Sequence, residues 1–158
     1  RPPRPNETHG VDYFFVTRAE FEQMIADDEL IEYAKVYSDY KGVPKAQVRQ
    51  AMASGKDVVM RIDVQGAKTM REKFPEAVLI FLTTNSEEEF IQRLTARGTE
   101  SPEEMQLRIV TAYRELETST LFDYVVINAN DHLDEAVNDI IAIISAEHHR
   151  VEHRKVSL

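Results

Sequence analysis

Three short apolar runs, separated by stretches with helical periodicity, most constrain what this chain can fold into. They are Val58–Asp63, Val78–Leu82 and Phe122–Asn128. Nearly continuous apolar runs of this length are typical of parallel strands that are buried on both faces. Because strands that alternate with helices favour a parallel sheet covered by helices, the sequence predicts an α/β fold.

Helical patterns lie between and after these runs. Four helices are expected: one ending near Lys73 before Pro75, one from Ser86 to Arg97, one from Ser101 to about Thr118, and one that Asp131 caps. Ser86 and Ser101 each precede a glutamate by three residues, which is a capping-box pattern. A polar tail from His148 is expected to be solvated.

The residues before Gly55 have a different pattern. They predict short strands at Tyr13–Val16 and Leu30–Tyr37, a helix over Arg18–Asp28, and a helix from Pro44 that Gly55 ends. The change from short strands to buried ones near Gly55 indicates a subdomain inserted before a core.

The composition excludes several classes of function. The net charge of −9 disfavours a general nucleic-acid binder, although a local arginine cluster can still bind small phosphates. The chain has no cysteine, so disulfides, thiolate metal sites and a cysteine nucleophile are excluded. No run of eighteen apolar residues occurs, so no membrane span is expected.

Asp63 and a set of arginines are the candidate functional residues. Asp63 ends a predicted buried strand, where ligands of open α/β sheets bind, and the alternative is an N-cap of the next helix. Arg93 and Arg97 are four residues apart and so share one face of their predicted helix, and Arg108 lies on the following helix. A group of arginines of this kind suits phosphate binding. The alternative for the arginines is a solvated face paired with Glu89 and Glu100.

The N-terminal loop combines arginines with Glu7 and Tyr13. Arg1 and Arg4 flank a proline-rich segment there. A carboxylate can accept two hydrogen bonds from the edge of guanine, whereas adenine offers no such donor pair. This combination suggests a site for a guanine nucleotide.

Five segments, in order, resemble guanylate kinases. They are RPPRPNETHGVDYFFV, FEQMIADDELIE, VVMRIDVQGA, RLTARGTES and FDYVVIN, and the resemblance runs from Arg1 to about Glu147. It implies a P-loop nucleoside monophosphate kinase-like three-layer core with a parallel sheet, an inserted GMP-binding subdomain and a helical lid. Residues 1–55 would be the GMP-binding subdomain, 56–85 core, 86–117 the lid region and return helix, and 118–158 core, C-terminal helix and tail.

The resemblance also implies roles for single residues. Arg1, Arg4 and Tyr13 would bind the GMP phosphate, Glu32 would bind the guanine edge, and Glu7 matches an acidic residue of the GMP loop. Asp63 would organise Mg²⁺ through water, and Arg93, Arg97 and Arg108 would stabilise the transferring phosphoryl group. Arg93, Arg97 and Asn128 would contact ATP. The implied reaction is the Mg²⁺- and ATP-dependent phosphorylation of GMP to GDP, and of dGMP to its own diphosphate, without a nucleic-acid or membrane partner.

The sequence departs from the family pattern at three positions. Lys41-Gly42-Val43 replaces a Tyr-Gly-Thr/Ser segment, and Arg61 stands where an acidic residue is frequent. We expect Lys41 to contact the GMP phosphate as a point charge, whereas Val43 cannot replace the hydroxyl. These forms are similar to plant-organelle members, which suggests a cytoplasmic or organellar (plastid or mitochondrial) protein.

No G-x-x-x-x-G-K-[ST] phosphate loop occurs in the sequence. We therefore expect the natural protein to carry that loop upstream, and residues 1–158 alone to be inactive. Two alternatives remain open. One is an inactive guanylate kinase-like scaffold module that binds phosphorylated partners, and the other is a related kinase with a different acceptor.

Overall fold

The computed structural model describes residues 2–36, 39–97, 106–107, 109–111 and 119–158. These form two compact units, each described by itself: an N-terminal unit of Arg1–Lys73 with Ser157–Leu158, and a C-terminal unit of Phe74–Val156. Most of the helix expected from Ser101 to Thr118 lies outside the described residues. Among the described residues, no helix has the length and apolar character needed to cross a membrane.

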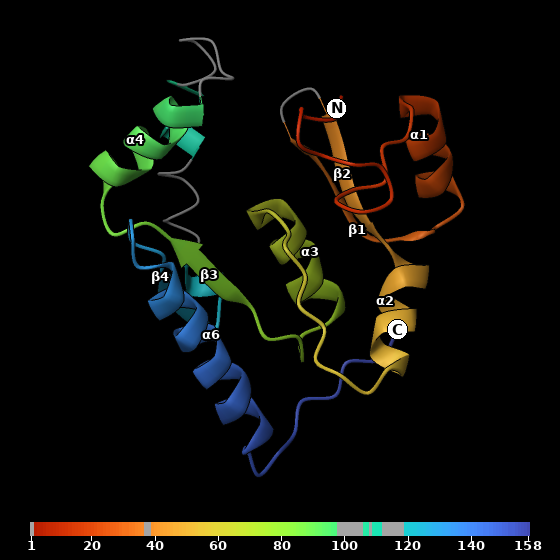
Figure 1. The fold of residues 1–158 in the computed structure, drawn as a ribbon. Helices are drawn as coiled ribbons and strands as arrows, with labels where there is room; N and C mark the ends of the chain where they lie inside the picture. Colours follow the sequence, from red (N-terminus) through yellow and green to blue (C-terminus); the bar gives the residue numbers. More distant parts are fainter. Residues whose placement is uncertain (1, 37–38, 98–105, 108, 112–118) are drawn as a thin grey trace. The chain divides into compact units, whose positions relative to one another are not determined.

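The N-terminal unit joins an antiparallel hairpin to three helices (Figure 1). Its elements are α1 (Arg18–Ala26), β1 (Leu30–Val36), β2 (Asp39–Pro44), α2 (Lys45–Ala53) and α3 (Val64–Lys73). Thr17 and Glu20 form a capping box at the start of α1. Apolar side chains from all three helices and from β1 form the core, with Ile31 and Met70 the most deeply buried. Burying them stabilises the unit by removing apolar surface from water.

The predicted helices and the first hairpin strand of this unit are confirmed, with shifted ends. The strand predicted at Tyr13–Val16 is wrong. The backbone of Tyr13 pairs with His9 in an isolated bridge and not in a strand ladder, and the backbone N–H of Phe15 donates to His9 Nδ1 at 3.1 Å. These local bonds replace the pairing that a strand needs. The second hairpin strand, β2, was not predicted, because its Lys41-Gly42 step interrupts any apolar pattern.

The strand predicted at Val58–Asp63 is also wrong in this structure. The described residues contain no strand that pairs with this segment, and Val59 is 77% exposed. A strand is stabilised by hydrogen bonds to a neighbour, so an apolar run without a partner does not form one.

The C-terminal unit contains the parallel strands. β3 (Ile80–Thr83) pairs with β4 (Tyr124–Ile127) in a register that sets Ile80 opposite Tyr124 and Thr83 opposite Ile127. α4 (Glu87–Arg97), the short 3-10 helix η1 (Ser119–Leu121) and α6 (Leu133–His148), which packs on β4, complete it (Figure 1). Two of the three predicted core strands and the α/β class are therefore confirmed.

The final helix differs in detail from the prediction. His132, not Asp131, is its N-cap, and no side chain caps it. Ala136 is its buried residue, while Val137 is 44% and Ile141 57% exposed, so the apolar side of α6 is only partly covered.

Most of the polar tail is exposed, as the sequence predicts, but Arg154 is held by two carboxylates. Arg154 Nη1 and Nη2 each donate to Asp123 Oδ1 at 3.2 Å, and Nε lies 3.2 Å from Glu147 Oε2. The two carboxylates have further partners, since Asp123 Oδ2 accepts from Leu79 N and Glu147 Oε1 accepts from the Tyr124 hydroxyl. The guanidinium thus joins the tail to the start of β4 and the end of α6.

We expect Arg154→Ala to lower the free energy of unfolding by about 1–2 kcal/mol, because it removes a guanidinium that bonds two partly buried carboxylates, those of Asp123 and Glu147. Arg150→Ala is the matched control. Arg150 approaches the same Glu147 oxygen at 3.7 Å, but its side chain is 47% exposed, against 21% for Arg154. Its loss should cost less than about 0.5 kcal/mol. Urea unfolding of both variants measures the difference, and equal losses would contradict the assignment.

Candidate functional site

The buried carboxylate of Glu32 is the centre of the candidate site. Glu32 lies on β1 and is only 5% exposed, as the one buried charged residue among those described. Its side chain lies against the first turn of α3, where a Cβ on residue 66 would come within 2.4 Å of Glu32 Oε2. Gly66 is therefore required for this carboxylate to lie against the helix.

Asp63 lies beside Glu32 as the residue that caps α3. The backbone N–H of Gly66 donates to Asp63 Oδ1 at 2.8 Å, and Ala67 N donates to Asp63 O at 2.8 Å. This is the N-cap arrangement that the sequence left open for Asp63. The catalytic role implied by the resemblance stays a prediction.

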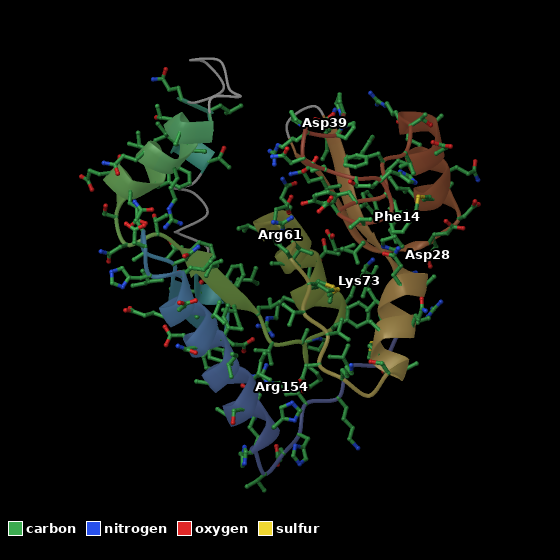
Figure 2. All side chains as sticks on the ribbon, in the orientation of Figure 1. Phe14, Asp28, Asp39, Arg61, Lys73 and Arg154 are labelled. Atoms are coloured by element: carbon green, nitrogen blue, oxygen red, sulfur yellow. The ribbon has the colours of Figure 1, made fainter. Side chains whose placement is uncertain are left out.

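The surroundings of Glu32 disfavour the ionised form of its carboxyl group. Burial, and next the negative charge of Asp63, raise the pKa of Glu32 to about 7, while the Lys73 ammonium acts in the opposite direction. Lys73 lies at the end of α3 (Figure 2), and its Nζ donates to Ile31 O at 3.4 Å. A ligand that offers two N–H donors would favour the ionised carboxylate, because it replaces the lost hydration.

The hairpin places Lys41 and Val43 on the same face as Glu32. Val43 lies opposite Glu32 in the register, and Lys41 lies opposite Ala34, two residues along β1. Directly opposed residues of antiparallel strands project to one face. A Cβ on residue 42 would come within 2.9 Å of Glu32 O, so Gly42 permits the close approach of the two strands.

Carboxylates organise the loop before α1. Glu7 Oε2 accepts from Arg4 N at 2.8 Å, and its other oxygen lies 3.9 Å from Arg4 Nη1. Asp12 Oδ2 accepts from Thr8 N at 2.8 Å. Glu7 therefore positions the backbone and guanidinium of Arg4, which sequence reasoning did not foresee.

Tyr13 contacts Arg61, a residue 48 positions further along the chain. Arg61 Nη2 donates to the Tyr13 hydroxyl oxygen, and its Cζ lies 5.8 Å from the centroid of the Tyr13 ring. Sequence reasoning singled out Arg61 only as a departure from the family pattern. One sequence carries no signal for a contact at this separation.

In the C-terminal unit, Arg93 joins α4 to the segment after β4. Its Nη2 donates to Glu89 Oε1 at 2.5 Å and to Asn128 O at 2.6 Å, and its Nε donates to Asn130 Oδ1 at 2.9 Å. The pair with Glu89 is the alternative that the sequence left open for this arginine. Asn128 itself donates its N–H to Thr83 O at 2.7 Å.

The structure thus divides the predicted residues. Arg4, Glu7, Tyr13, Glu32, Lys41 and Asp63 belong to the N-terminal unit, and Arg93 and Asn128 to the C-terminal unit. Arg1, Arg108 and the side chain of Arg97 lie outside the described part. Within the described ranges, no group of three or more His, Cys, Asp or Glu side chains could hold a metal ion.

Comparison with known proteins gives the context. The family model described as guanylate kinase matches residues 1–147. The chain is 46% identical over 159 residues to guanylate kinase 2, chloroplastic/mitochondrial, of Oryza sativa, covering 100% of this chain and 56% of the rice protein. It is 47% identical over 150 residues to guanylate kinase of Thermus thermophilus, covering 95% of this chain and 67% of that one.

A solved structure shows the same fold. The crystal structure of guanylate kinase from Anaplasma phagocytophilum matches with a TM-score of 0.79 at 30% identity, over 96% of this chain and 73% of that chain. The predicted nucleoside monophosphate kinase-like fold is therefore confirmed. The chain spans a little over half the length of the rice relative. With a family model matched over residues 1–147, the chain belongs to the guanylate kinase family.

Proposed function

We propose that this protein is a guanylate kinase, which transfers the terminal phosphoryl group of ATP to GMP to form GDP, or to dGMP to form dGDP, and leaves ADP. The observation that carries the proposal is the buried carboxylate of Glu32. A buried acceptor whose burial disfavours its own charge is suited to a ligand edge with two adjacent N–H donors, which guanine has and adenine lacks.

The GMP phosphate is assigned to Arg1, Arg4, Tyr13 and Lys41. Lys41 lies on the hairpin face of Glu32, so a nucleotide whose base meets Glu32 directs its phosphate along that face. Glu7 acts in this proposal by holding Arg4. Arginine and lysine suit a phosphate dianion through charge-assisted hydrogen bonds.

Arg93, Arg97 and Arg108 are assigned to the transferring phosphoryl group, and Arg93, Arg97 and Asn128 to ATP. Catalysis would proceed by positioning and charge stabilisation, with no covalent intermediate on the protein. Mg²⁺ would enter with ATP and neutralise phosphate charge. Mg²⁺ is usually held by substrate phosphates, water and one or two carboxylates, so Asp63, acting through water, fits this role without a cluster of protein ligands.

The functional division follows the same assignment. Residues 1–55 would bind GMP, 56–85 and 118–158 would form the core, and 86–117 would form the lid and return helix. The partners would be GMP and ATP, with no nucleic acid or membrane. The name of the rice relative supports a plastid or mitochondrial location, with the cytoplasm as the alternative.

The direct test offers the full-length protein ATP, Mg²⁺ and equal concentrations of labelled GMP, dGMP or AMP, and measures the labelled diphosphate that forms from each acceptor (GDP, dGDP or ADP). We expect turnover with GMP and dGMP. A preference for AMP would contradict the guanine assignment and favour the related kinase with another acceptor, which the missing hydroxyl at Val43 motivates. Phosphopeptide binding without any turnover would instead favour the scaffold alternative.

Replacing Glu32 should change guanosine binding and folding stability in opposite directions. We expect Glu32→Gln to weaken guanosine binding by at least about tenfold at pH 8, because a neutral amide is a poorer acceptor for two donors. Wild-type affinity should rise between pH 6 and 8 as the carboxyl ionises, and the variant should lack this rise. Titration calorimetry with guanosine excludes the ionisation of the nucleotide phosphate from the measurement.

The same variant should be more stable above neutral pH. The pKa of Glu32 is about 7 in the folded protein against an ordinary 4.5, so the folded state holds this proton more tightly. Wild-type stability is therefore lost as pH rises from about 4.5 to 7, and the Gln variant lacks that loss. Allowing for solvent screening, we expect a gain of about 1–2 kcal/mol at pH 8 and none near pH 4. Glu29→Gln, at an exposed position, is the control and should show no such gain.

Lys41→Ala should raise the dissociation constant for GMP by about 3- to 10-fold and change guanosine binding much less, because the proposed contact of Lys41 is with the phosphate, which guanosine lacks. Lys35→Ala is the matched control. It removes the same charge from the same hairpin, but Lys35 lies on the opposite face, across from Tyr40. An unchanged GMP affinity in Lys41→Ala would show that this lysine does not bind the phosphate.

A further inference from the structure

We propose that Arg61 is a positioning residue for the phosphate of GMP, acting through the hydroxyl of Tyr13. This inference rests on the proposed function, in which Tyr13 donates to that phosphate. It assigns a role to the cation at a position where acidic residues are frequent in similar proteins.

The geometry of the contact carries the proposal. Arg61 Nη2 donates to the Tyr13 hydroxyl oxygen, and its guanidinium carbon lies 5.8 Å from the ring centroid. The arginine therefore holds both the ring and its oxygen. Arg61 lies in the segment that leads into α3, near the start of that helix (Figure 2), in the same compact unit as Tyr13. It thus joins the N-terminal loop to the segment that also supplies Asp63 and Gly66.

The direction of the hydrogen bond decides what Tyr13 can do. A guanidinium has only donors, so the phenol oxygen must be the acceptor. The phenol's own hydrogen then points away from Arg61, toward another acceptor, and a phosphate oxygen of GMP is the acceptor we assign. A cation bonded to the phenol oxygen also polarises the O–H group and strengthens its donation to an anion.

A second arginine close to a tyrosine ring shows that such a contact alone does not make a phosphate site. Arg18 lies 5.6 Å from the centroid of the Tyr40 ring, but its Nε pairs with Glu22 Oε1 at 2.8 Å. That carboxylate neutralises its charge. Among the described residues, no carboxylate pairs with Arg61, whose recorded contacts are both with Tyr13. Its charge is therefore available to an anion bound by Tyr13.

The test compares GMP with guanosine as ligands of the full-length protein, its Arg61→Ala and Tyr13→Phe variants, and the double variant. The ratio of the two dissociation constants isolates the phosphate, because both ligands carry the same base and the titration of Glu32 cancels. We expect Arg61→Ala to weaken GMP binding by about 5- to 20-fold and guanosine binding by less than twofold. In the Tyr13→Phe background, removing Arg61 should have a much smaller effect, because the hydroxyl through which it acts is gone.

Arg61→Lys keeps the charge without the planar fork and should restore part of the lost affinity. Arg18→Ala, which removes the other arginine close to a tyrosine ring, should leave the GMP-to-guanosine ratio unchanged. An equal loss of both ligands in Arg61→Ala would show that the arginine only supports the fold. Additive effects in the double variant would show that it does not act through Tyr13, and either result overturns the proposal.

The two proposals fail in distinguishable ways. If the wild-type protein bound neither GMP nor guanosine, the proposed function would be wrong and the role of Arg61 with it. If the wild-type protein bound GMP normally and Arg61→Ala bound it equally well, only the role of Arg61 would be wrong.

Discussion

The burial of Glu32 against the first turn of α3 is the constraint on which the N-terminal unit depends. The carboxylate fits there only because residue 66 has no side chain. Asp63 caps that turn and so adds a second negative charge nearby, which raises the cost of ionising Glu32. A buried acidic group with a raised pKa is unfavourable for folding above neutral pH. Its presence is therefore better explained by a ligand that donates to it than by stability.

The three departures from the family pattern, Lys41, Val43 and Arg61, can be explained together from the hairpin register and their charges. Val43 lies opposite Glu32, so the base site has an apolar neighbour where a hydroxyl is frequent in the family. Lys41 and Arg61 both add positive charge to the unit that holds Tyr13. The substitutions thus remove one neutral contact to the base and strengthen the electrostatic attraction for a phosphate. GMP binding by this protein would then depend more on charge, and so more on salt concentration, than GMP binding by a protein with tyrosine and threonine at these positions.

The sequence predicted the elements whose signals are local. Ser86 and Pro75 mark helix ends, and the runs that became β3 and β4 were identified by continuous apolar residues. Predictions failed where a strand depends on a partner. Val58–Asp63 has the same apolar pattern as β3 but no paired strand among the described residues, and β2 forms because β1 lies beside it although its own pattern is weak. Contacts such as Tyr13 with Arg61 depend on tertiary structure and leave no trace in a single sequence.

In the candidate site, one residue can have a structural contact and also a proposed role in the reaction. Arg93 is held by Glu89 and by the carbonyl of Asn128, and Asp63 is used as a helix cap. The pair of Arg93 with Glu89 is partly buried, with 32% of the Arg93 side chain and 11% of the Glu89 side chain exposed. A phosphate offers an arginine bidentate and more highly charged contacts than a single carboxylate oxygen does. In the proposed mechanism a phosphoryl group would replace Glu89 as a partner of Arg93, while the bond to the Asn128 carbonyl would keep the guanidinium in place. In this view the ion pair keeps Arg93 ordered before its ligand arrives, which reduces the entropy lost on binding.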